Sequence, residues 1–333
     1  MVLVKQQPKV SVLLPVYNCE KYLAETLNSL VCQTYDNFEV IAIDDGSTDG
    51  SLAVLRHYAG FDDRIKVFEQ SNKGLVNTLN KAASLATGKL FARIDGDDLA
   101  TPMRLELQVR EMILHPECVL LGSSFDVVDE GSEFLYHDAV PTLQDDIKLA
   151  MYYRNPLAHG SIMMRRKAFE AAGGYSTDCG PTEDYELWMR MIKIGEVHAL
   201  PNSLFRWRIN PNGITSTRSD AMKSFMDVNI EQYWRENPFH VVSRRELMRR
   251  IRYYLSDESR GSVSRKHAVL HDLCRVSLKL MKRQRVIEAF YQLLVVCSTG
   301  RTGIRVLCEA MREPINWHVH RRIRNKFRKR NIS

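Results

Sequence analysis

The sequence predicts an α/β fold with a mostly parallel central sheet flanked by helices, followed by a mainly helical, basic C-terminal extension. Two observations lead to this expectation. Strand-like and helix-like segments alternate through the first part of the chain, which is typical of a parallel sheet. The balance of charge then changes sign near residue 235. We therefore expect one domain over residues 1–234 and an extension over residues 235–333.

Four apolar runs are the predicted strands. The first two are continuous apolar runs, as expected for strands that are covered on both faces. The runs are the segments 9–17, 38–45, 64–70 and 89–95.

Helices are predicted between these strands. The segment 21–33 places its apolar side chains at helical spacing. A second helix follows Ser47, Thr48 and Asp49, any of which can cap its first turn. The segment 74–86 is the third helix, so each strand is followed by a helix before the next strand begins.

Composition excludes several classes of protein. With 333 residues and 44% hydrophobic content, the chain can fill one large or two ordinary globular domains. We expect no secretory signal, because the apolar start is short and runs directly into a strand. No apolar run reaches the roughly 18–20 residues that span a bilayer. Seven cysteines without a C-x-x-C pair argue against a disulfide framework or a structural zinc site, so we expect reduced thiols and a cytoplasmic protein.

The net charge of +7 hides a division of the chain. Residues 235–333 hold 24 Lys and Arg against 8 Asp and Glu, a balance of +16. Residues 1–234 hold 23 against 32, a balance of −9. A mildly acidic body therefore carries a strongly basic tail, and we expect the two parts to have different partners.

Acidic and polar side chains follow three of the predicted strands. The sequence is Pro-Val-Tyr-Asn at 15–18, Asp-Asp-Gly-Ser at 44–47 and Asp-Gly-Asp-Asp at 95–98. Ligands of open α/β sheets bind where the carboxyl ends of strands meet. Carboxylates this close repel one another, and a divalent cation between them relieves the repulsion. Mg²⁺ or Mn²⁺ suits oxygen ligands and completes its coordination shell with water and substrate phosphates.

Two common phosphate-binding motifs are absent from the sequence. Neither G-x-G-x-x-G nor G-x-x-x-x-G-K-[ST] occurs, so a dinucleotide fingerprint and a P-loop are both unsupported. A nucleotide diphosphate bridged by a metal ion fits the acidic strand ends better.

These residues resemble glycosyltransferase family 2. The resemblance rests on the Asp-Asp-Gly-Ser block at 44–47, the Asp-Gly-Asp-Asp block at 95–98, the segment HGSIMMRRKAFEAAGGY at 159–175 and the Glu-Asp-x-x-Leu-Trp block at 183–188. It ends near WRINPNGITS at 207–216, and so covers about two thirds of the chain. The resemblance implies an inverting enzyme with the GT-A fold.

The resemblance assigns the donor site residue by residue. It implies that Pro15, Tyr17 and Asp45 hold the nucleotide base, with the Tyr17 ring available to stack. It implies that Asp95 contacts the ribose and that Asp97 binds the metal.

Other interpretations of these residues stay open at this point. Tyr17 could be a core aromatic residue, and Asp44 and Asp45 could cap a helix. The segment 95–98 could be a solvated acidic turn, and within the resemblance Asp98 holds the loop or a water ligand.

The resemblance also implies that Asp184 is the catalytic base. An inverting transfer needs one carboxylate to take the proton from the attacking acceptor hydroxyl. Glu183 is the close rival and by family position contacts the acceptor, while either residue could instead place favourable charge at a helix start. Leu187 and Trp188 are expected to pack beside the acceptor pocket.

Two further blocks are less decisive. His159 is either a contact behind the sugar site or a satisfied interior histidine. The segment beginning at Trp207 resembles the closing loop of the family, with Asn210 where a metal-assisting His is usual. Arg208 in this loop is expected to reach a phosphate oxygen.

The tail suggests a membrane surface. The segment 243–256 is amphipathic, with an apolar face and five arginines, and 320–330 is almost purely basic. Such helices bind anionic lipid surfaces, each cation contributing on the order of 1 kcal/mol. The alternative is a helical extension that packs on the first domain or on a second subunit.

The sequence thus predicts a metal-dependent inverting glycosyltransferase. It would move a hexose or N-acetylhexosamine from a nucleotide-diphosphate sugar, UDP-linked, to a glycan or lipid-linked acceptor of surface polysaccharide synthesis, at the inner face of the cell membrane. The alternative is a nucleic-acid-binding protein or a nucleotidyltransferase that uses the basic tail. The order of the three acidic blocks speaks against this alternative, and we expect no nucleic acid partner.

Overall fold

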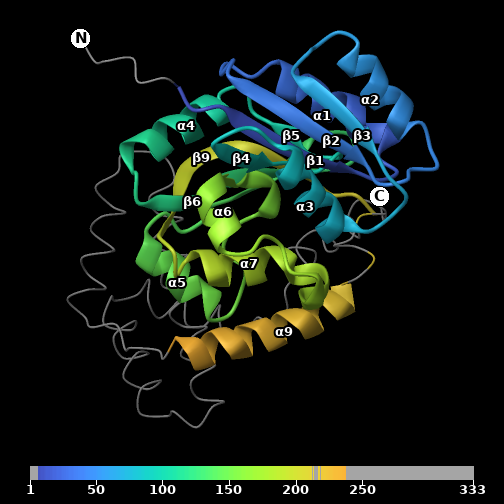
Figure 1. The fold of residues 1–333 in the computed structure, drawn as a ribbon. Coiled ribbons are helices and arrows are strands. Elements are labelled where there is room, and N and C mark those ends of the chain that lie inside the picture. Colours follow the sequence, from blue (N-terminus) through green and yellow to red (C-terminus); the bar gives the residue numbers. More distant parts are fainter. Residues whose placement is uncertain (1–6, 212, 214–216, 218, 238–333) are drawn as a thin grey trace, which may run out of the picture. The chain divides into compact units, whose positions relative to one another are not determined.

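A computed structural model describes residues 7–211, 213, 217 and 219–237 of the chain (Figure 1). The described residues fall into two compact units. One holds the residues up to Lys148 together with Asn155–Asn229, and the other holds Leu149–Arg154 and the residues from Ile230 onwards. The predicted boundary at residues 234 and 235 stays a prediction, and most of the basic tail lies outside the described residues.

The strands form one nine-stranded sheet in the described part of the chain, in the order β3-β2-β1-β4-β8-β6-β9-β5, with β7 paired to β6. Their bounds are β1 Val10–Val16, β2 Phe38–Asp44, β3 Ile65–Glu69, β4 Leu90–Arg93, β5 Leu99–Ala100, β6 Cys118–Val128, β7 Phe134–Asp138, β8 Met163–Arg165 and β9 Glu196–Arg208.

Helices connect these strands (Figure 1). Their bounds are α1 Glu20–Val31, α2 Ser51–Ala59, α3 Leu75–Leu85, α4 Arg104–Leu114, α5 Gln144–Met151, α6 Arg166–Ala171, α7 Glu183–Met191 and α9 Ser219–Glu236, with the short 3-10 helices η1 His159–Ser161 and η2 Thr177–Thr182.

The predicted α/β architecture is confirmed. The four predicted strands are β1 to β4, the three predicted helices are α1 to α3, and β1 pairs in parallel with both β2 and β4. The longest pairing, β6 with β9, is also parallel and runs from Cys118 opposite Glu196 to Val128 opposite Arg208. The antiparallel pairs that β8 makes with β4 and β6 are short.

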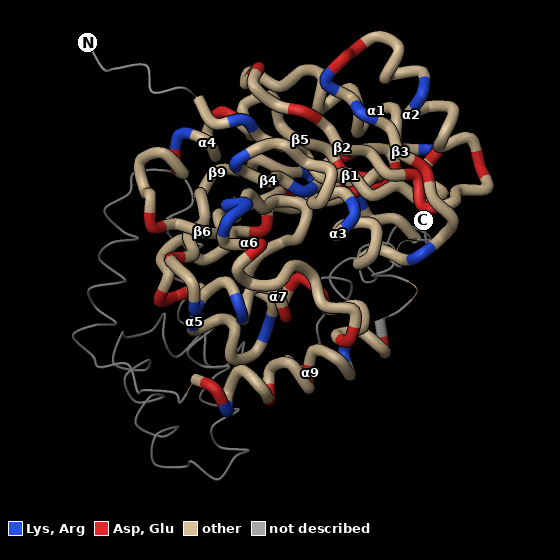
Figure 2. Tube along the Cα trace, viewed as in Figure 1, with Lys and Arg blue, Asp and Glu red and all other residues tan. Residues whose placement is uncertain are grey.

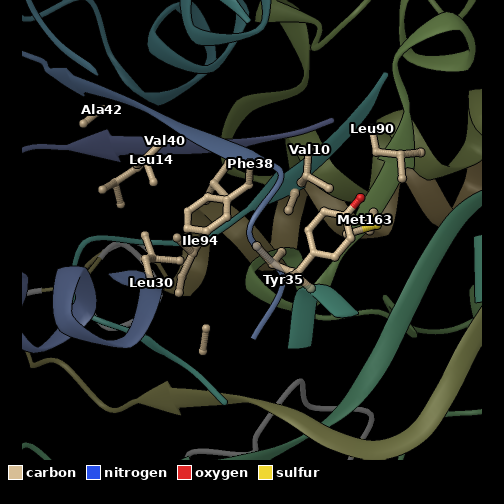
Figure 3. Packing of buried hydrophobic residues seen from close by; sticks show 14 of the residues in the cluster. Val10, Leu14, Leu30, Tyr35, Phe38, Val40, Ala42, Leu90, Ile94 and Met163 are labelled. Carbon is tan, nitrogen blue, oxygen red and sulfur yellow. The ribbon is translucent and has the colours of Figure 1, made fainter. Parts of the chain in front are cut away.

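A hydrophobic cluster covers one face of the sheet (Figure 3). Alternate β1 residues, including Val10 and Leu14, pack there with Leu27 of α1 and Val109 of α4. Fully burying one such side chain contributes about 1.5–3 kcal/mol to folding. Every residue of β1 and β2 is buried, as expected for strands covered on both faces.

The parallel pairing brings the acidic strand ends together. Val16, the last residue of β1, lies opposite Asp44, the last residue of β2. β4 runs parallel on the other side of β1, so the segment 94–98 leaves the sheet at the same edge. Ligand sites of such sheets form at this edge.

Two expectations about compartment and chemistry can be compared with the described residues. No helix among them is long and apolar enough to cross a membrane. The cysteines among the described residues, Cys19, Cys32, Cys118 and Cys179, form no disulfide there, and the expectation of reduced thiols stays a prediction.

A buried carboxylate connects the amino ends of the parallel strands, at the end of the sheet opposite the acidic strand ends. The Glu39 side chain is 2% exposed and lies at the start of β2. Its Oε1 accepts hydrogen bonds from Ser11 Oγ and from the backbone N–H of Thr87, each at 2.7 Å. Its Oε2 pairs with Lys66 Nζ at 2.6 Å and with Lys9 Nζ at 2.9 Å. One side chain thus connects the starts of β1, β2, β3 and β4.

Glu39→Gln should lower the free energy of unfolding by about 1–3 kcal/mol, because the buried carboxylate loses the charge that its hydrogen bonds and its two partly exposed lysine partners stabilise. Burial opposes ionisation of Glu39, but the hydrogen bonds from Lys66, Ser11, Thr87 and Lys9 outweigh it and lower the pKa. The contribution is therefore present above the ordinary pKa of 4.5 and is lost as the pH falls below it. Urea unfolding at several pH values measures it.

The matched control is Glu69→Gln, since Glu69 pairs with Arg56 at the surface. Its effect should stay within about 0.5 kcal/mol. Equal losses in both variants at neutral pH would contradict the role of Glu39.

Candidate active site

Three carboxylates form the acidic cluster on the loop after β4. Ligand oxygens of Asp95, Asp97 and Asp98 lie within 4.8 Å of one another. Burial, followed by the charge of Asp95, raises the pKa of Asp97. Burial and both neighbouring carboxylates raise the pKa of Asp98 well above its ordinary range. Crowded hard oxygen donors that resist ionisation are a donor set that a divalent cation fits.

Each carboxylate of the acidic cluster has a different protein partner. Both oxygens of Asp95 accept from the guanidinium of Arg93, the last residue of β4, whose side chain is only 3% exposed. Asp98 Oδ1 accepts from the backbone N–H of Arg208 at 2.8 Å. Asp97 Oδ2 accepts from Asn210 Nδ2 at 2.8 Å. Asn210 is therefore at the predicted metal ligand, where its amide acts as a donor to the carboxylate.

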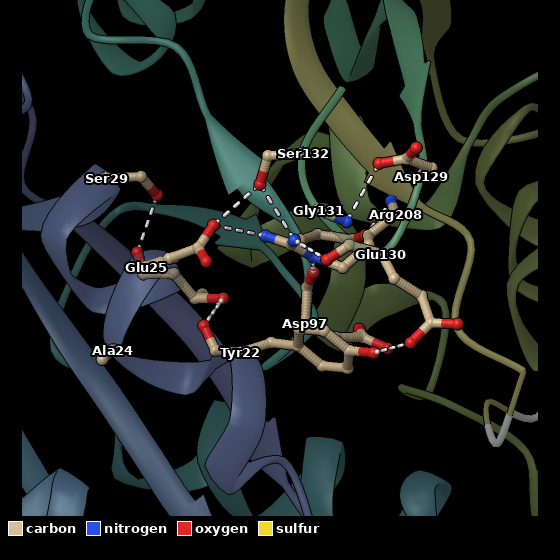
Figure 4. A network of polar contacts seen from close by, with 12 residues as sticks. Tyr22, Ala24, Glu25, Ser29, Asp97, Asp129, Glu130, Gly131, Ser132 and Arg208 are labelled. Carbon is tan, nitrogen blue, oxygen red and sulfur yellow. Dashed lines mark hydrogen bonds and ion pairs between the residues drawn. The ribbon is translucent and has the colours of Figure 1, made fainter. Parts of the chain in front are cut away.

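The guanidinium of Arg208 holds the loop of the acidic cluster in place (Figure 4). The side chain is completely buried, and its Nε donates to the carbonyl oxygen of Asp97 at 2.7 Å. Nη1 donates to Glu130 O and Ser132 Oγ, each at 2.9 Å, and Nη2 pairs with Glu25 Oε2 at 2.8 Å. These contacts connect β9, α1 and the turn before β7 to the acidic loop.

This geometry bears on the expected phosphate contact of Arg208. The guanidinium contacts four protein oxygens and lies 4.8 Å from the ring centroid of Tyr22. Its hydrogen bond lowers the pKa of Glu25, so that carboxylate stays ionised. In this structure Arg208 thus organises the backbone of the loop that carries the acidic cluster, and its contact with a phosphate remains a prediction.

The predicted base-binding residues lie at the ends of β1 and β2. Pro15 is buried within β1, whereas Tyr17 is 49% exposed, so the interpretation of Tyr17 as a core aromatic residue is wrong. Asp45 is buried and accepts from Gln70 Nε2 at 2.7 Å and from the backbone N–H of Gly74 at 2.9 Å. Asp45 therefore orders the loop between β3 and α3.

Hydrogen bonds join the loop between β1 and α1 to the loop between β2 and α2. Asn18, with a positive φ of 51°, accepts from the N–H of Thr48 through its Oδ1 at 2.8 Å. Asp49 accepts from the first N–H groups of two helices, Glu20 of α1 and Ser51 of α2. The N-cap position of α2 is Gly50, so the predicted cap is one residue off, and Asp49 serves both helix starts.

Glu183 and Asp184 open helix α7. Glu183 is buried, and its Oε1 lies 3.6 Å from His159 Nδ1. Asp184 Oδ2 accepts from Asn155 Nδ2 at 2.6 Å. Burial raises the pKa of both carboxyl groups. A carboxylate of raised basicity is suited to take a proton from a sugar hydroxyl.

His159 is held neutral behind these carboxylates. Its Nε2 lies 2.8 Å from the hydroxyl of Tyr175. Burial, and then the charge of Arg93, lower the pKa of His159 to about 3. His159 is thus a buried contact of Glu183, which joins the two interpretations offered by the sequence.

Arg93 interacts both with the acidic cluster and with the carboxylates of helix α7. It pairs with Asp95, and its charge lowers the pKa of Glu183 and of Asp184 against the larger, opposite effect of burial. Burial disfavours the charge of Arg93, yet Asp95 and its neighbours raise its pKa and keep it cationic. One buried cation therefore acts on both groups of carboxylates.

Sequence comparisons give the family. The profile of Glycosyl transferase family 2 matches residues 11–173. EpsE of Bacillus subtilis is 40% identical over 196 residues, which cover 56% of this chain and 68% of EpsE. The amylovoran biosynthesis glycosyltransferase AmsE of Erwinia amylovora is 34% identical over 213 residues, 62% of this chain and 79% of AmsE. This chain belongs to glycosyltransferase family 2.

Solved structures agree on the fold of this glycosyltransferase. TarS of S. aureus, residues 1–349 in complex with UDP-GlcNAc, has a TM-score of 0.57 at 18% identity, covering 91% of this chain and 90% of that one. The mannosyltransferase PcManGT of Pyrobaculum calidifontis, in complex with GDP-Man and Mn²⁺, has a TM-score of 0.50 at 17% identity, covering 92% and 80%. The GT-A fold is confirmed.

Several residues of this glycosyltransferase site were not predicted. Arg93, Asn155 and Glu25 contact the predicted residues but were given no role, and neither was Tyr175, although it ends the segment 159–175. Arg93 gave one signal, a cation two positions before Asp95 in an otherwise apolar strand. Glu25 gave none, since its partner Arg208 is 183 positions away.

Proposed function

We propose that this glycosyltransferase moves a hexose or N-acetylhexosamine, with inversion, from a UDP-linked sugar to a glycan or lipid-linked acceptor of surface polysaccharide synthesis. The complex of TarS with UDP-GlcNAc supports a nucleotide-sugar donor, and AmsE supports a polysaccharide role. So does WbnJ of Escherichia coli, an O-antigen biosynthesis glycosyltransferase that is 31% identical over 55% of this chain and 71% of WbnJ. Family membership favours this function over nucleotidyl transfer.

One observation carries the proposal. Arg93 pairs with Asp95 of the acidic cluster, which suits a cation and a diphosphate, and its charge also acts on the buried Glu183 and the partly exposed Asp184. A transferase needs this combination, because the leaving diphosphate and the attacking hydroxyl must meet at one sugar carbon.

The residues of the chain then take the following roles. Asp97 would hold Mn²⁺ or Mg²⁺ with help from its neighbours, and the bound cation would supply positive charge to the leaving diphosphate. Asp95 would contact the ribose. Asp184 takes the proton from the acceptor hydroxyl. The oxygen of that hydroxyl attacks the anomeric carbon as the bond from this carbon to the diphosphate breaks. Glu183 contacts the acceptor.

The base and the phosphates would be held at the neighbouring strand ends. The exposed ring of Tyr17 is available to stack on the base, next to Pro15 and Asp45. Arg208 acts on the phosphates chiefly because it orders the loop of the acidic cluster. A direct contact between Arg208 and a phosphate would require its four hydrogen bonds to rearrange.

The metal role can be tested with Asp97→Ala. The variant should lose turnover and lose the Mn²⁺ dependence of UDP binding, because the diphosphate loses its bridge to the protein. Calorimetry of UDP binding with and without Mn²⁺ measures this, beside a panel of sugar nucleotides that identifies the donor. UDP affinity that ignores Mn²⁺ in the native protein would refute the metal assignment.

The base role can be tested with Asp184→Asn, which keeps shape but removes basicity. The kcat value should fall by about 10²–10⁴ while donor and metal affinity stay within a few-fold. Glu183→Gln is the matched control and should act more on the KM of the acceptor than on kcat. Near-native kcat in Asp184→Asn, or a product that retains the donor's anomeric configuration, would refute the assignment.

We also propose that the tail attaches the enzyme to the inner face of the cytoplasmic membrane, since residues 235–333 carry a balance of +16. Figure 2 shows, by contrast, acidic and basic residues interspersed along the described chain. The variant 1–240 should no longer sediment with anionic vesicles at near-physiological salt, while it keeps activity on a soluble acceptor. Equal vesicle binding by truncated and full-length protein would contradict this role.

A further inference from the structure

We propose that Asn155 is a positioning residue that orients the carboxylate of Asp184 for proton transfer. The inference rests on the proposed role of Asp184 as the base. Asn155 follows β7 and α5 in the chain and lies 29 positions before Asp184. Its side-chain amide makes a short hydrogen bond to that carboxylate, from Nδ2 to Oδ2, at 2.6 Å.

The amide of Asn155 is fixed by the turn that it begins. Asn155 Oδ1 accepts from the backbone N–H of Leu157 at 3.2 Å, across Pro156. This is an Asx turn, and an Asn-Pro pair is a common start of such turns. Because Oδ1 faces Leu157, the NH₂ group must face Asp184. The turn therefore presents a donor, and not an acceptor, to the carboxylate.

Asp184 accepts one hydrogen bond from the backbone at the start of helix α7 and a second one from Asn155. Asp184 stands in the first turn, where backbone N–H groups lack helical partners and attract a carboxylate. Asp184 Oδ1 already accepts from the N–H of Tyr185 at 2.7 Å. Asn155 holds the second oxygen, so the plane of the carboxylate is set from two sides. Each oxygen keeps a further lone pair for an acceptor hydroxyl.

The charged environment of Asp184 makes the effect of Asn155 measurable. Burial raises the pKa of Asp184, and Glu183 adds to this increase, while His159 and Arg93 oppose it. The hydroxyl of Tyr175 and the thiol of Cys179 are the further titratable groups that interact with Asp184. A hydrogen bond to the ionised form favours ionisation, so losing the bond from Asn155 should raise the pKa further. The base then needs a higher pH to work.

The test uses two variants of the full-length enzyme. Asn155→Ser can still accept from Leu157 but is too short to reach Asp184. Asn155→Asp keeps the size but faces Asp184 with a like charge. In both, kcat should fall by about 10- to 100-fold, and the acidic limb of the kcat–pH profile should move to higher pH by about one unit, more in Asn155→Asp. UDP affinity should not change.

Asn37→Ser is the matched control, because Asn37 makes a comparable hydrogen bond, to Gln7 O at 2.8 Å, at the opposite edge of the sheet. It should leave kcat and the profile unchanged. Thermal melts show whether each variant is folded. If folded Asn155→Ser keeps the native kcat and pH profile, the inference is wrong.

A double variant separates this inference from the base assignment. Asn155→Ser placed on Asp184→Asn should lower kcat no further than Asp184→Asn alone, because Asn155 acts through Asp184. A further fall would mean that Asn155 contacts the substrate itself and would overturn the inference. If Asp184→Asn alone is fully active, the proposed base is wrong whatever Asn155 does.

Discussion

The crowding of three carboxylates behind β4 is the constraint on which the rest of the site depends. Asp95, Asp97 and Asp98 have ligand oxygens within 4.8 Å of one another, and Asp98 is buried while the other two are partly exposed. Such a group costs free energy unless positive charge and hydrogen-bond donors surround it. The fold supplies Arg93 on one side and Arg208 on the other. The remaining demand for positive charge suits a divalent cation and its substrate phosphates.

The two arginines act in different ways. Arg93 pairs with Asp95 directly, and its charge also acts on Glu183 and Asp184, so the carboxylates of helix α7 share a cation with the acidic cluster. Arg208 pairs with Glu25 and binds the backbone around Asp97, so it fixes where the loop lies more than how much charge it carries. A guanidinium suits the second task because its donors are held in one plane.

The carboxyl and amino ends of the parallel strands have opposite roles. At the amino ends, Glu39 is fully satisfied by two lysines, a serine and a threonine, and its carboxylate is ionised by its partners. At the carboxyl ends, burial and the repulsion between neighbouring carboxylates raise the pKa of Asp97 and Asp98. The contacts of Glu39 stabilise the sheet. The crowded carboxylates at the carboxyl ends cost stability, which a fold tolerates only when the remainder of the sheet is stable.

Local sequence patterns were enough to predict where strands β1 to β4 lie in the chain, the end of the sheet that carries Asp45 and Asp97, and the family whose resemblance implies that Asp184 is a base. These follow from local hydrophobic pattern and from short motifs, because parallel neighbours bring consecutive strand ends to one edge. Only the tertiary structure decided that Arg208 is buried against Glu25 and that Asn155 binds Asp184. Those contacts join segments far apart in the chain, and no local pattern of hydrophobicity or charge records which distant side chain fills a given buried hydrogen bond.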